Sequence, residues 1–157
     1  MKILTALFFV ASLVLIAAAA ACKRTPIPSG EVSFVSTSNQ GDLIKIAAIG
    51  YGSKEHDIIA DAERRAIETL LFVGLTGSSV QSPMVTDPNA RETQKEYLKQ
   101  LLDEKGYRRY VSAPGVANNI GKDKRTGKKS ALVNLEVNVL ALRRELERQN
   151  LTRKFGL

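Results

Sequence analysis

Three residue types that serve nucleophilic catalysis lie close together at Ser53, His56 and Asp57, and His56 is the single histidine of the chain. A catalytic triad needs the histidine between the other two residues, with an oxyanion site near the serine. Neighbours within one turn of a single helix are poorly placed for that geometry, and Ser53 is explained as the cap of the helix that follows. We therefore expect no catalytic residue here and predict that the protein is not an enzyme.

Asp57, Asp61 and Glu68 could supply oxygen ligands to a hard cation. Their spacing puts them on the outward face of a helix, where Asp61 and Arg65 can form an ordinary i,i+4 ion pair. A zinc site of the common His/Cys kind is also not expected, because the chain has one histidine and one cysteine. The sequence thus predicts no metal and no cofactor.

The run Gly50-Tyr51-Gly52 comes just before this helix, and a glycine turn at a helix N-terminus can hold a phosphate. The dinucleotide fingerprint requires a third glycine where this chain has Glu55, whose charge would repel phosphate, and no P-loop Lys-Ser/Thr pair follows. The favoured interpretation is structural: the glycines let the chain turn sharply into a helix.

Positive charge is concentrated in the last third of the chain. Residues 41–106 carry 8 basic and 11 acidic side chains, whereas residues 107–157 carry 12 basic and 4 acidic ones. Five of these cations gather at a polar hairpin tip, and they are Lys122, Lys124, Arg125, Lys128 and Lys129. Such a tip attracts anionic phospholipid, lipopolysaccharide or another acidic envelope component. The alternative is that the lysines confer solubility and keep sheet edges from pairing.

The N-terminal segment indicates export. Lys2 precedes a run of apolar and small residues, 3–21, that ends at Cys22, the only cysteine. Residues 16–22 resemble a bacterial lipobox, although Ala19 stands where leucine is most common. We predict a signal peptide over residues 1–21 and lipidation of Cys22, since a free thiol in an exported protein is hazardous. Ordinary signal-peptidase cleavage and retention of the run as an anchor are the alternatives.

Residues 22–30 then form the lipidated N-terminus and a tether, in which Pro26 and Pro28 disfavour helix. We expect a lipid-anchored protein of the cell envelope, on the outer membrane and facing the periplasm or the cell surface. Nucleic acid is not an expected partner, because the export signal removes the chain from it.

Residues 31–157 are predicted to form one α+β domain, since 44% hydrophobic and 25% charged residues are typical of a soluble globular chain. Alternation predicts strands at residues 31–36, 43–49, 107–111 and 131–140. A 3.6-residue period predicts helices at residues 54–73, 87–105 and 141–150. The expected fold is an antiparallel sheet of about four strands with two or three helices packed on one face. The inward face of the first helix is predicted from its spacing to be Ile59, Ala62, Ala66, Leu70 and Val73.

Several short stretches in this order support a resemblance. They are 31–35 (EVSFV), 48–52 (AIGYG), Asp61-Ala62, 71–78 (LFVGLTGS), 83–85 (PMV), 142–147 (LRRELE) and 153–156 (RKFG). Together they resemble small envelope lipoproteins of Bacteroidetes-type bacteria. More distantly, the strand-Gly-x-Gly-helix unit with its Asp-Ala pair resembles the N-terminal domain of flagellar assembly protein T and related outer-membrane lipoproteins. Neither resemblance brings a catalytic residue or a ligand.

Two functions are compatible with these observations. The first is a non-enzymatic envelope lipoprotein, held to the membrane by its lipid, whose domain acts as an interaction or structural module for an envelope protein or an anionic polymer. The second is a periplasmic binding module that holds an anionic envelope ligand through the basic hairpin at residues 122–129.

Overall fold

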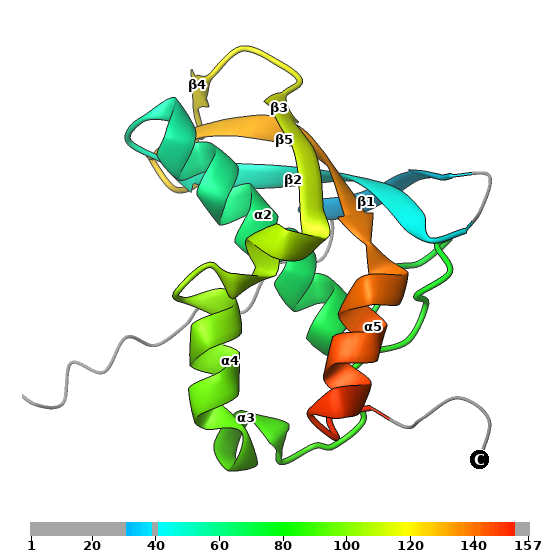
Figure 1. Cartoon of the computed structure of the whole chain (residues 1–157). Coiled ribbons are helices and arrows are strands. Elements are labelled where there is room, and N and C mark those ends of the chain that lie inside the picture. The colour runs from blue at the N-terminus through cyan, green and yellow to red at the C-terminus, as the bar shows by residue number, and fades with distance from the viewer. Residues whose placement is uncertain (1–30, 39–40, 153–157) are drawn as a thin grey trace, which may run out of the picture.

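An antiparallel sheet forms the frame of the domain (Figure 1). The computed structural model describes residues 31–38 and 41–152, so the predicted signal peptide, Cys22 and the tether lie outside the described residues. The strands are β1 (Val32–Thr37), β2 (Leu43–Gly52), β3 (Val111–Val116), β4 (Gly121–Lys122) and β5 (Lys129–Asn138). Their order is β1-β2-β5-β3, and the short β4 also pairs with β5.

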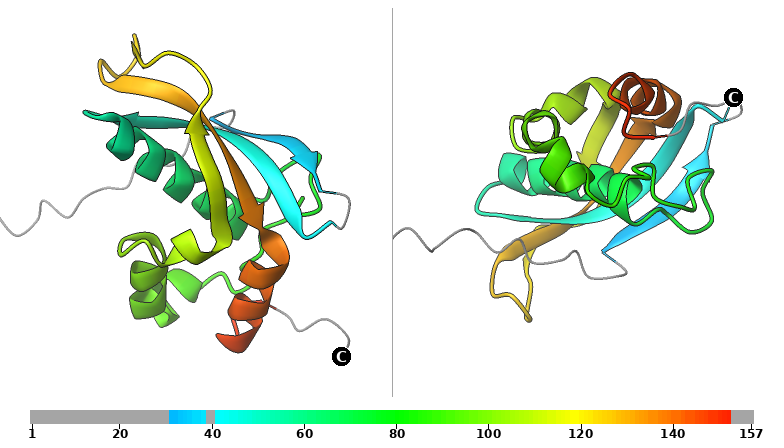
Figure 2. Two further views of the ribbon diagram at one scale, coloured as in Figure 1. Left: turned by 45° about the horizontal axis from the view of Figure 1, so that its top comes forward. Right: turned by 90° about the horizontal axis from the view of Figure 1, so that it is seen from below.

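The helices lie on one face of this sheet (Figure 2). They are α2 (Glu55–Phe72), α3 (Ala90–Thr93), α4 (Lys95–Leu102) and α5 (Val139–Arg148), with a 3₁₀ helix η1 (Gly106–Tyr110) between α4 and β3. The predicted α+β class is therefore confirmed, with β4 as an additional strand.

The central strands β2 and β5 alternate between a buried and a wet face. Their inward side chains are almost completely buried, and these are Ile44, Ile46, Ala48, Val133, Leu135 and Val137. On the other face Lys45 and Glu136 lie opposite each other and form an ion pair of 3.2 Å. A period of two with one apolar face is expected of an antiparallel sheet that is covered on one side.

Helix α2 supplies the main apolar cover of the sheet. Ile58, Ala62, Ala66 and Leu70 are each 0% exposed. The predicted face was wrong at its ends, because Ile59 is only partly buried and Val73 is 64% exposed. The buried side chains form an i,i+4 row from Ile58 to Leu70 with Ile67 and Leu71 beside it, and Val73 lies beyond the end of the helix.

The start of α2 also differs from the prediction. Lys54, not Ser53, occupies the N-cap position. The Asp57 carboxylate accepts a hydrogen bond of 3.1 Å from the Lys54 backbone N–H, so a side chain within the helix satisfies a group at its beginning.

The predicted helix over residues 87–105 is divided into α3 and α4. Gln94 separates them with φ −118° and ψ 31°, outside the α-helical region. The first helix starts later than predicted, because Asn89 is the N-cap and α3 begins at Ala90. Asp87 lies before it and accepts a hydrogen bond from the Asn89 backbone N–H, at 2.9 Å.

The predicted strand over residues 107–111 is instead η1, followed by β3. Tyr107 and Tyr110 are both buried, whereas Arg108 and Arg109 are exposed. A 3₁₀ helix repeats every three residues and so directs both tyrosines to the core, which the alternation of a strand cannot do.

The last helix begins earlier than predicted, at Val139. The Asn138 side chain caps it by accepting a hydrogen bond of 2.8 Å from the Ala141 backbone N–H. Leu142 and Leu146, predicted to face inward, are each 0% exposed.

None of the helices in the described part of the chain is long and apolar enough to cross a membrane.

Candidate functional site

The turn between β4 and β5 presents the basic tip. The Asp123 carboxylate accepts hydrogen bonds from the backbone N–H and the hydroxyl of Thr126, at 2.6 and 2.8 Å. These bonds hold the pKa of Asp123 below its ordinary value. The Asp123 N–H donates to the Lys128 carbonyl at 2.8 Å, and Gly127 adopts a positive φ of 71° that suits glycine. The tip is therefore a bonded turn with a defined shape.

All five predicted basic residues are exposed, and within the described residues four of them form no ion pair with a carboxylate. We call Lys122, Lys124, Lys128 and Lys129 the hairpin lysines. Lys122 and Lys129 are directly opposite each other in the β4–β5 ladder. Like charges in that position repel and destabilise the pairing. The hairpin lysines thus form an open patch of positive charge.

The fifth residue, Arg125, has a different role. Its guanidinium donates to Glu31 at 2.5 Å and to the Tyr51 hydroxyl at 3.2 Å. It therefore belongs to an ion cluster that the sequence does not predict.

Glu31 lies at the centre of this cluster and is 7% exposed. Its carboxylate also accepts hydrogen bonds from Arg65, at 2.6 Å, and from the Tyr51 hydroxyl, at 2.9 Å. Arg65 in turn bonds to Asp61 at 2.7 Å, which is the predicted i,i+4 pair. We call Glu31, Tyr51, Asp61, Arg65 and Arg125 the Glu31 cluster. It joins the start of β1, the end of β2, helix α2 and the hairpin tip.

These contacts hold Tyr51 in place near the C-terminal end of β2. Burial raises the pKa of its hydroxyl, and the Arg65 guanidinium lies 5.0 Å from the centre of its ring. The Tyr51 backbone N–H donates to Asp61 at 3.0 Å. A phosphate at this glycine turn would need such an N–H group, and here a carboxylate occupies it.

The two glycines beside Tyr51 serve close packing. A Cβ on Gly50 would lie 1.9 Å from the Ile58 carbonyl oxygen, and one on Gly52 would lie 2.5 Å from the Asp57 Cβ. Neither glycine is among those with positive φ. The glycines therefore have a structural role, as predicted, but the reason is different. They are needed because α2 packs against the backbone of β2, and not because the chain turns sharply there.

The Ser53, His56 and Asp57 group has no triad geometry. His56 and Asp57 are 3.0 Å apart, but the His56 side chain is 74% exposed and Ser53 is exposed too. The carboxylates weighed as cation ligands have separate partners, since Glu68 lies 3.8 Å from Arg64 and Asp57 bonds to the helix start. In residues 31–38 and 41–152, no group of three or more His, Cys, Asp or Glu could hold a metal ion.

Two further buried carboxylates were not predicted. Glu63, 3% exposed, pairs with Arg108 at 3.1 Å, and Glu145 pairs with Arg148 on the next turn of α5. The partner of Glu63 is 45 residues away along the chain, so no local pattern indicates it.

A second polar region lies where α4, η1 and α5 meet. The hydroxyls of Tyr97 and Tyr110 are buried without a hydrogen-bond partner among the described groups. Burial, and then the nearby charge of Glu145, raises the pKa of Tyr97. Burial also raises the pKa of Tyr110, so both hydroxyls are protonated at neutral pH.

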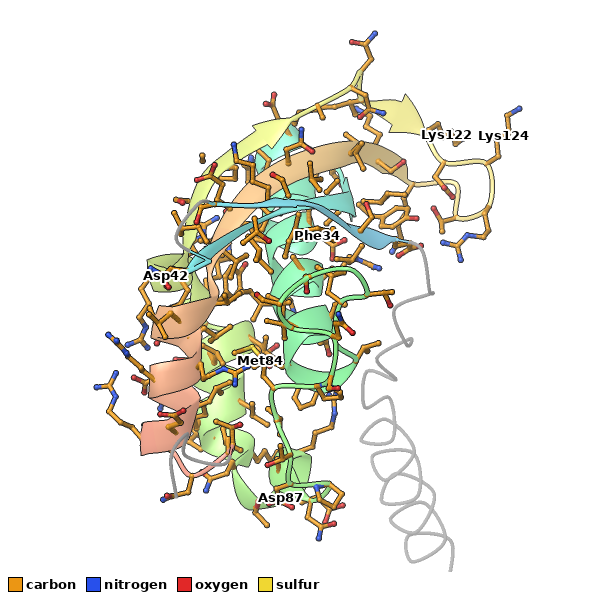
Figure 3. All side chains as sticks on the ribbon, turned by 90° about the vertical axis from the view of Figure 1, so that its right-hand side faces the viewer. Phe34, Asp42, Met84, Asp87, Lys122 and Lys124 are labelled. Atoms are coloured by element: carbon orange, nitrogen blue, oxygen red, sulfur yellow. The ribbon has the colours of Figure 1, made fainter. Side chains whose placement is uncertain are left out.

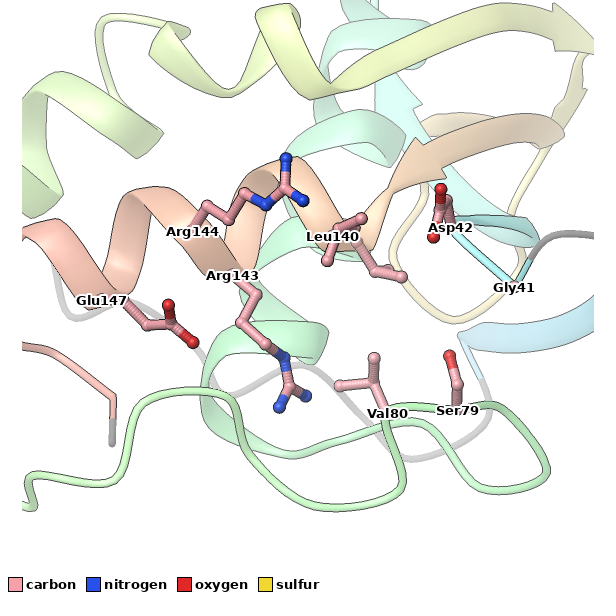
Figure 4. Close-up of a pocket in the computed structure, with 9 residues that line it drawn as sticks. Gly41, Asp42, Ser79, Val80, Leu140, Arg143, Arg144 and Glu147 are labelled. Atoms are coloured by element: carbon pink, nitrogen blue, oxygen red, sulfur yellow. The ribbon is translucent and has the colours of Figure 1, made fainter. Parts of the chain in front are cut away.

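An open groove of about 480 Å³ runs along α5 (Figure 4). Val80, Val139 and Leu140 give it an apolar part, while Arg143 and Arg144 line it from α5. The remaining lining residues are Gly41, Asp42, Ser79 and Glu147.

Comparison with family models, with curated proteins and with solved structures gives no match for this chain.

The polar groups thus divide into two kinds. Those of the Glu31 cluster bind one another and hold four parts of the fold together. The hairpin lysines carry charge that the described part of the domain leaves unpaired, which suits an anionic partner.

Proposed function

We propose that the protein is a lipid-anchored component of the bacterial cell envelope whose α+β domain is a non-enzymatic interaction module. In this proposal residues 1–21 are removed as a signal peptide, Cys22 carries the lipid, and residues 22–30 connect it to the domain. The expected location is the outer membrane, on its periplasmic or external side.

The position of Cys22 carries the proposal. The only cysteine of the chain directly follows the apolar run, where a lipobox places the residue that is acylated. Each buried methylene of an acyl chain contributes about 0.8 kcal/mol to membrane binding, so two or three acyl chains give durable anchoring. The resemblance to small envelope lipoproteins supports the same conclusion.

The Glu31 cluster supports a module that is held firmly at its attachment point. The chain joins the domain at Glu31, and this residue is bonded to α2 through Arg65 and to the hairpin through Arg125. Its ionisable groups have partners within the fold, which favours a structural role for them over a catalytic one.

Metabolic labelling with a fatty-acid analogue tests the anchor. We expect the native chain to be labelled and Cys22→Ala to be unlabelled, because that change removes the only thiol. Thr25→Ala is the matched control, since it alters the tether and keeps the cysteine. Equal labelling of the native chain and Cys22→Ala would refute lipidation.

A binding module for an anionic envelope ligand is the second candidate function. The observation that favours it is the open charge of the hairpin lysines. Arg125, which the sequence placed in the same patch, contributes less because Glu31 and Tyr51 bind its guanidinium.

A further inference from the structure

The attachment point of the domain and its basic tip lie at the same end of the sheet. Glu31, the first described residue, bonds to Arg125 at the tip, although the two are 94 residues apart in the chain. In Figure 3, Lys122 and Lys124 lie at one end of the molecule and Asp87 lies at the other. A lipid attached through residues 22–30 therefore leads to the end of the domain that carries the hairpin lysines.

The connecting segment is short. Residues 22–30 are nine residues, and an extended chain spans at most about 3.3–3.6 Å per residue, or roughly 30 Å in all. A lipid at Cys22 thus holds Glu31 within about one small-domain diameter of the bilayer. Charges attract a surface strongly within a Debye length of about 8 Å, and such a tether allows that approach.

The hairpin tip is positive because its five cations outnumber Asp123, the one carboxylate in residues 121–129. Glu31 is bonded to Arg65 and Arg125, and Asp123 is bonded to Thr126. Within the described residues the hairpin lysines form no ion pair with a carboxylate, and the like-charged Lys122 and Lys129 face each other across a strand pair. An anionic surface would relieve that repulsion.

From these observations we propose that the hairpin lysines bind the anionic phospholipid headgroups of the leaflet that holds Cys22, so that the hairpin faces the membrane and α3 faces away. This orientation rests on the lipid anchor of the proposed function. Near an anionic surface each lysine strengthens binding by a factor of about five. The tether raises the local concentration of lipid, so contacts that are weak alone become sufficient.

Fluorescence quenching on the lipidated full chain tests this orientation. Acylation consumes the native thiol, so Thr126→Cys at the tip or Glu92→Cys on α3 provides one labelling site. Glu92 is exposed, and its neighbour Thr93 is hydrogen-bonded to Asp87 at the far end. The labelled proteins are placed in vesicles that carry a headgroup quencher, made of phosphatidylcholine alone or with one third phosphatidylglycerol.

We expect strong quenching at residue 126 in the anionic vesicles, little in the neutral ones, and little at residue 92 in either. High salt should reverse the effect. Gln at all four hairpin lysines should abolish it. The matched control removes the same amount of charge elsewhere and has Gln at the exposed Lys45, Lys95, Lys99 and Lys105. This control should keep the quenching at residue 126. Equal quenching at both sites, or an unchanged signal in the hairpin variant, would overturn the proposal.

A second measurement separates this proposal from the anchor. Intact mass shows whether Cys22 is acylated, and an unmodified chain would refute the anchor and the orientation that rests on it, but not headgroup binding. The non-lipidated Cys22→Ser chain should still sediment with phosphatidylglycerol vesicles, and the four Gln substitutions should weaken this on the order of several hundred-fold. Equal sedimentation of the Cys22→Ser chain with and without the four Gln substitutions would overturn headgroup binding. So would release of the protein by inorganic phosphate beyond that caused by chloride of the same ionic strength.

Discussion

Replacing Glu31 by Gln should destabilise the domain more than any exposed charge change of the same kind. Its side chain is 8% exposed, and its carboxylate accepts hydrogen bonds from Arg65, Arg125 and Tyr51. Removing one partner of a fully buried ion pair costs about 3–5 kcal/mol. Here Arg65 keeps Asp61 and its side chain is 21% exposed, while the Arg125 side chain is 60% exposed. We therefore expect a loss of about 2 kcal/mol in the free energy of unfolding.

Urea unfolding of the non-lipidated Cys22→Ser chain measures this loss. With a slope of about 1–3 kcal/mol per molar urea, the midpoint should fall by roughly 1 M. Glu136→Gln is the control, because Glu136 pairs with a Lys45 side chain that is 57% exposed and should cost less than about 1 kcal/mol. A Glu31→Gln midpoint no lower than that of Glu136→Gln would refute the reasoning.

Two further predictions concern the core. Gly50→Ala should cost more than about 3 kcal/mol or prevent folding, because the new Cβ meets the α2 backbone at 1.9 Å. Gly115→Ala, with nothing within 4 Å of its Cβ, should have almost no effect on the urea midpoint, and equal effects would contradict the packing argument. Burial raises the pKa of Tyr107 to about 12, so the folded state holds its proton more tightly than the unfolded chain does. The contribution of Tyr107 to the free energy of unfolding should be fully present below pH ~10 and be lost between pH ~10 and ~12. Tyr107→Phe should show a shallower fall of the urea midpoint over that range, and an identical fall would contradict it.

Strands and helices with strong periodicity were predictable from the sequence. The alternation in β2 and β5 and the i,i+4 row of α2 both reflect one buried face, which a local pattern reveals. The errors fall where tertiary packing decides. The segment containing Tyr107 and Tyr110 has the composition of a strand, yet it forms a 3₁₀ turn because that conformation buries both rings.

The candidate site was predictable only in part. A run of lysines between strand patterns indicates an exposed tip, and the described structure has an exposed hairpin there. The sequence could not separate Arg125 from the hairpin lysines, because the residue that binds it, Glu31, is 94 positions away. Ion pairs between distant segments depend on strand order, and strand order is a property of the whole sheet.

The strand order itself explains why the attachment point and the basic tip lie together. β1 and β2 are antiparallel, and so are β2 and β5. The start of β1, the end of β2 and the start of β5 must therefore lie at one end of the sheet. Glu31 precedes the first of these, Tyr51 belongs to the second, and the hairpin tip precedes the third, so their contact follows from the pairing. If β5 joined the sheet in the opposite direction, the hairpin lysines would lie at the far end, away from a lipid at Cys22. The orientation that we propose at the membrane thus depends on the direction of β5 in the sheet.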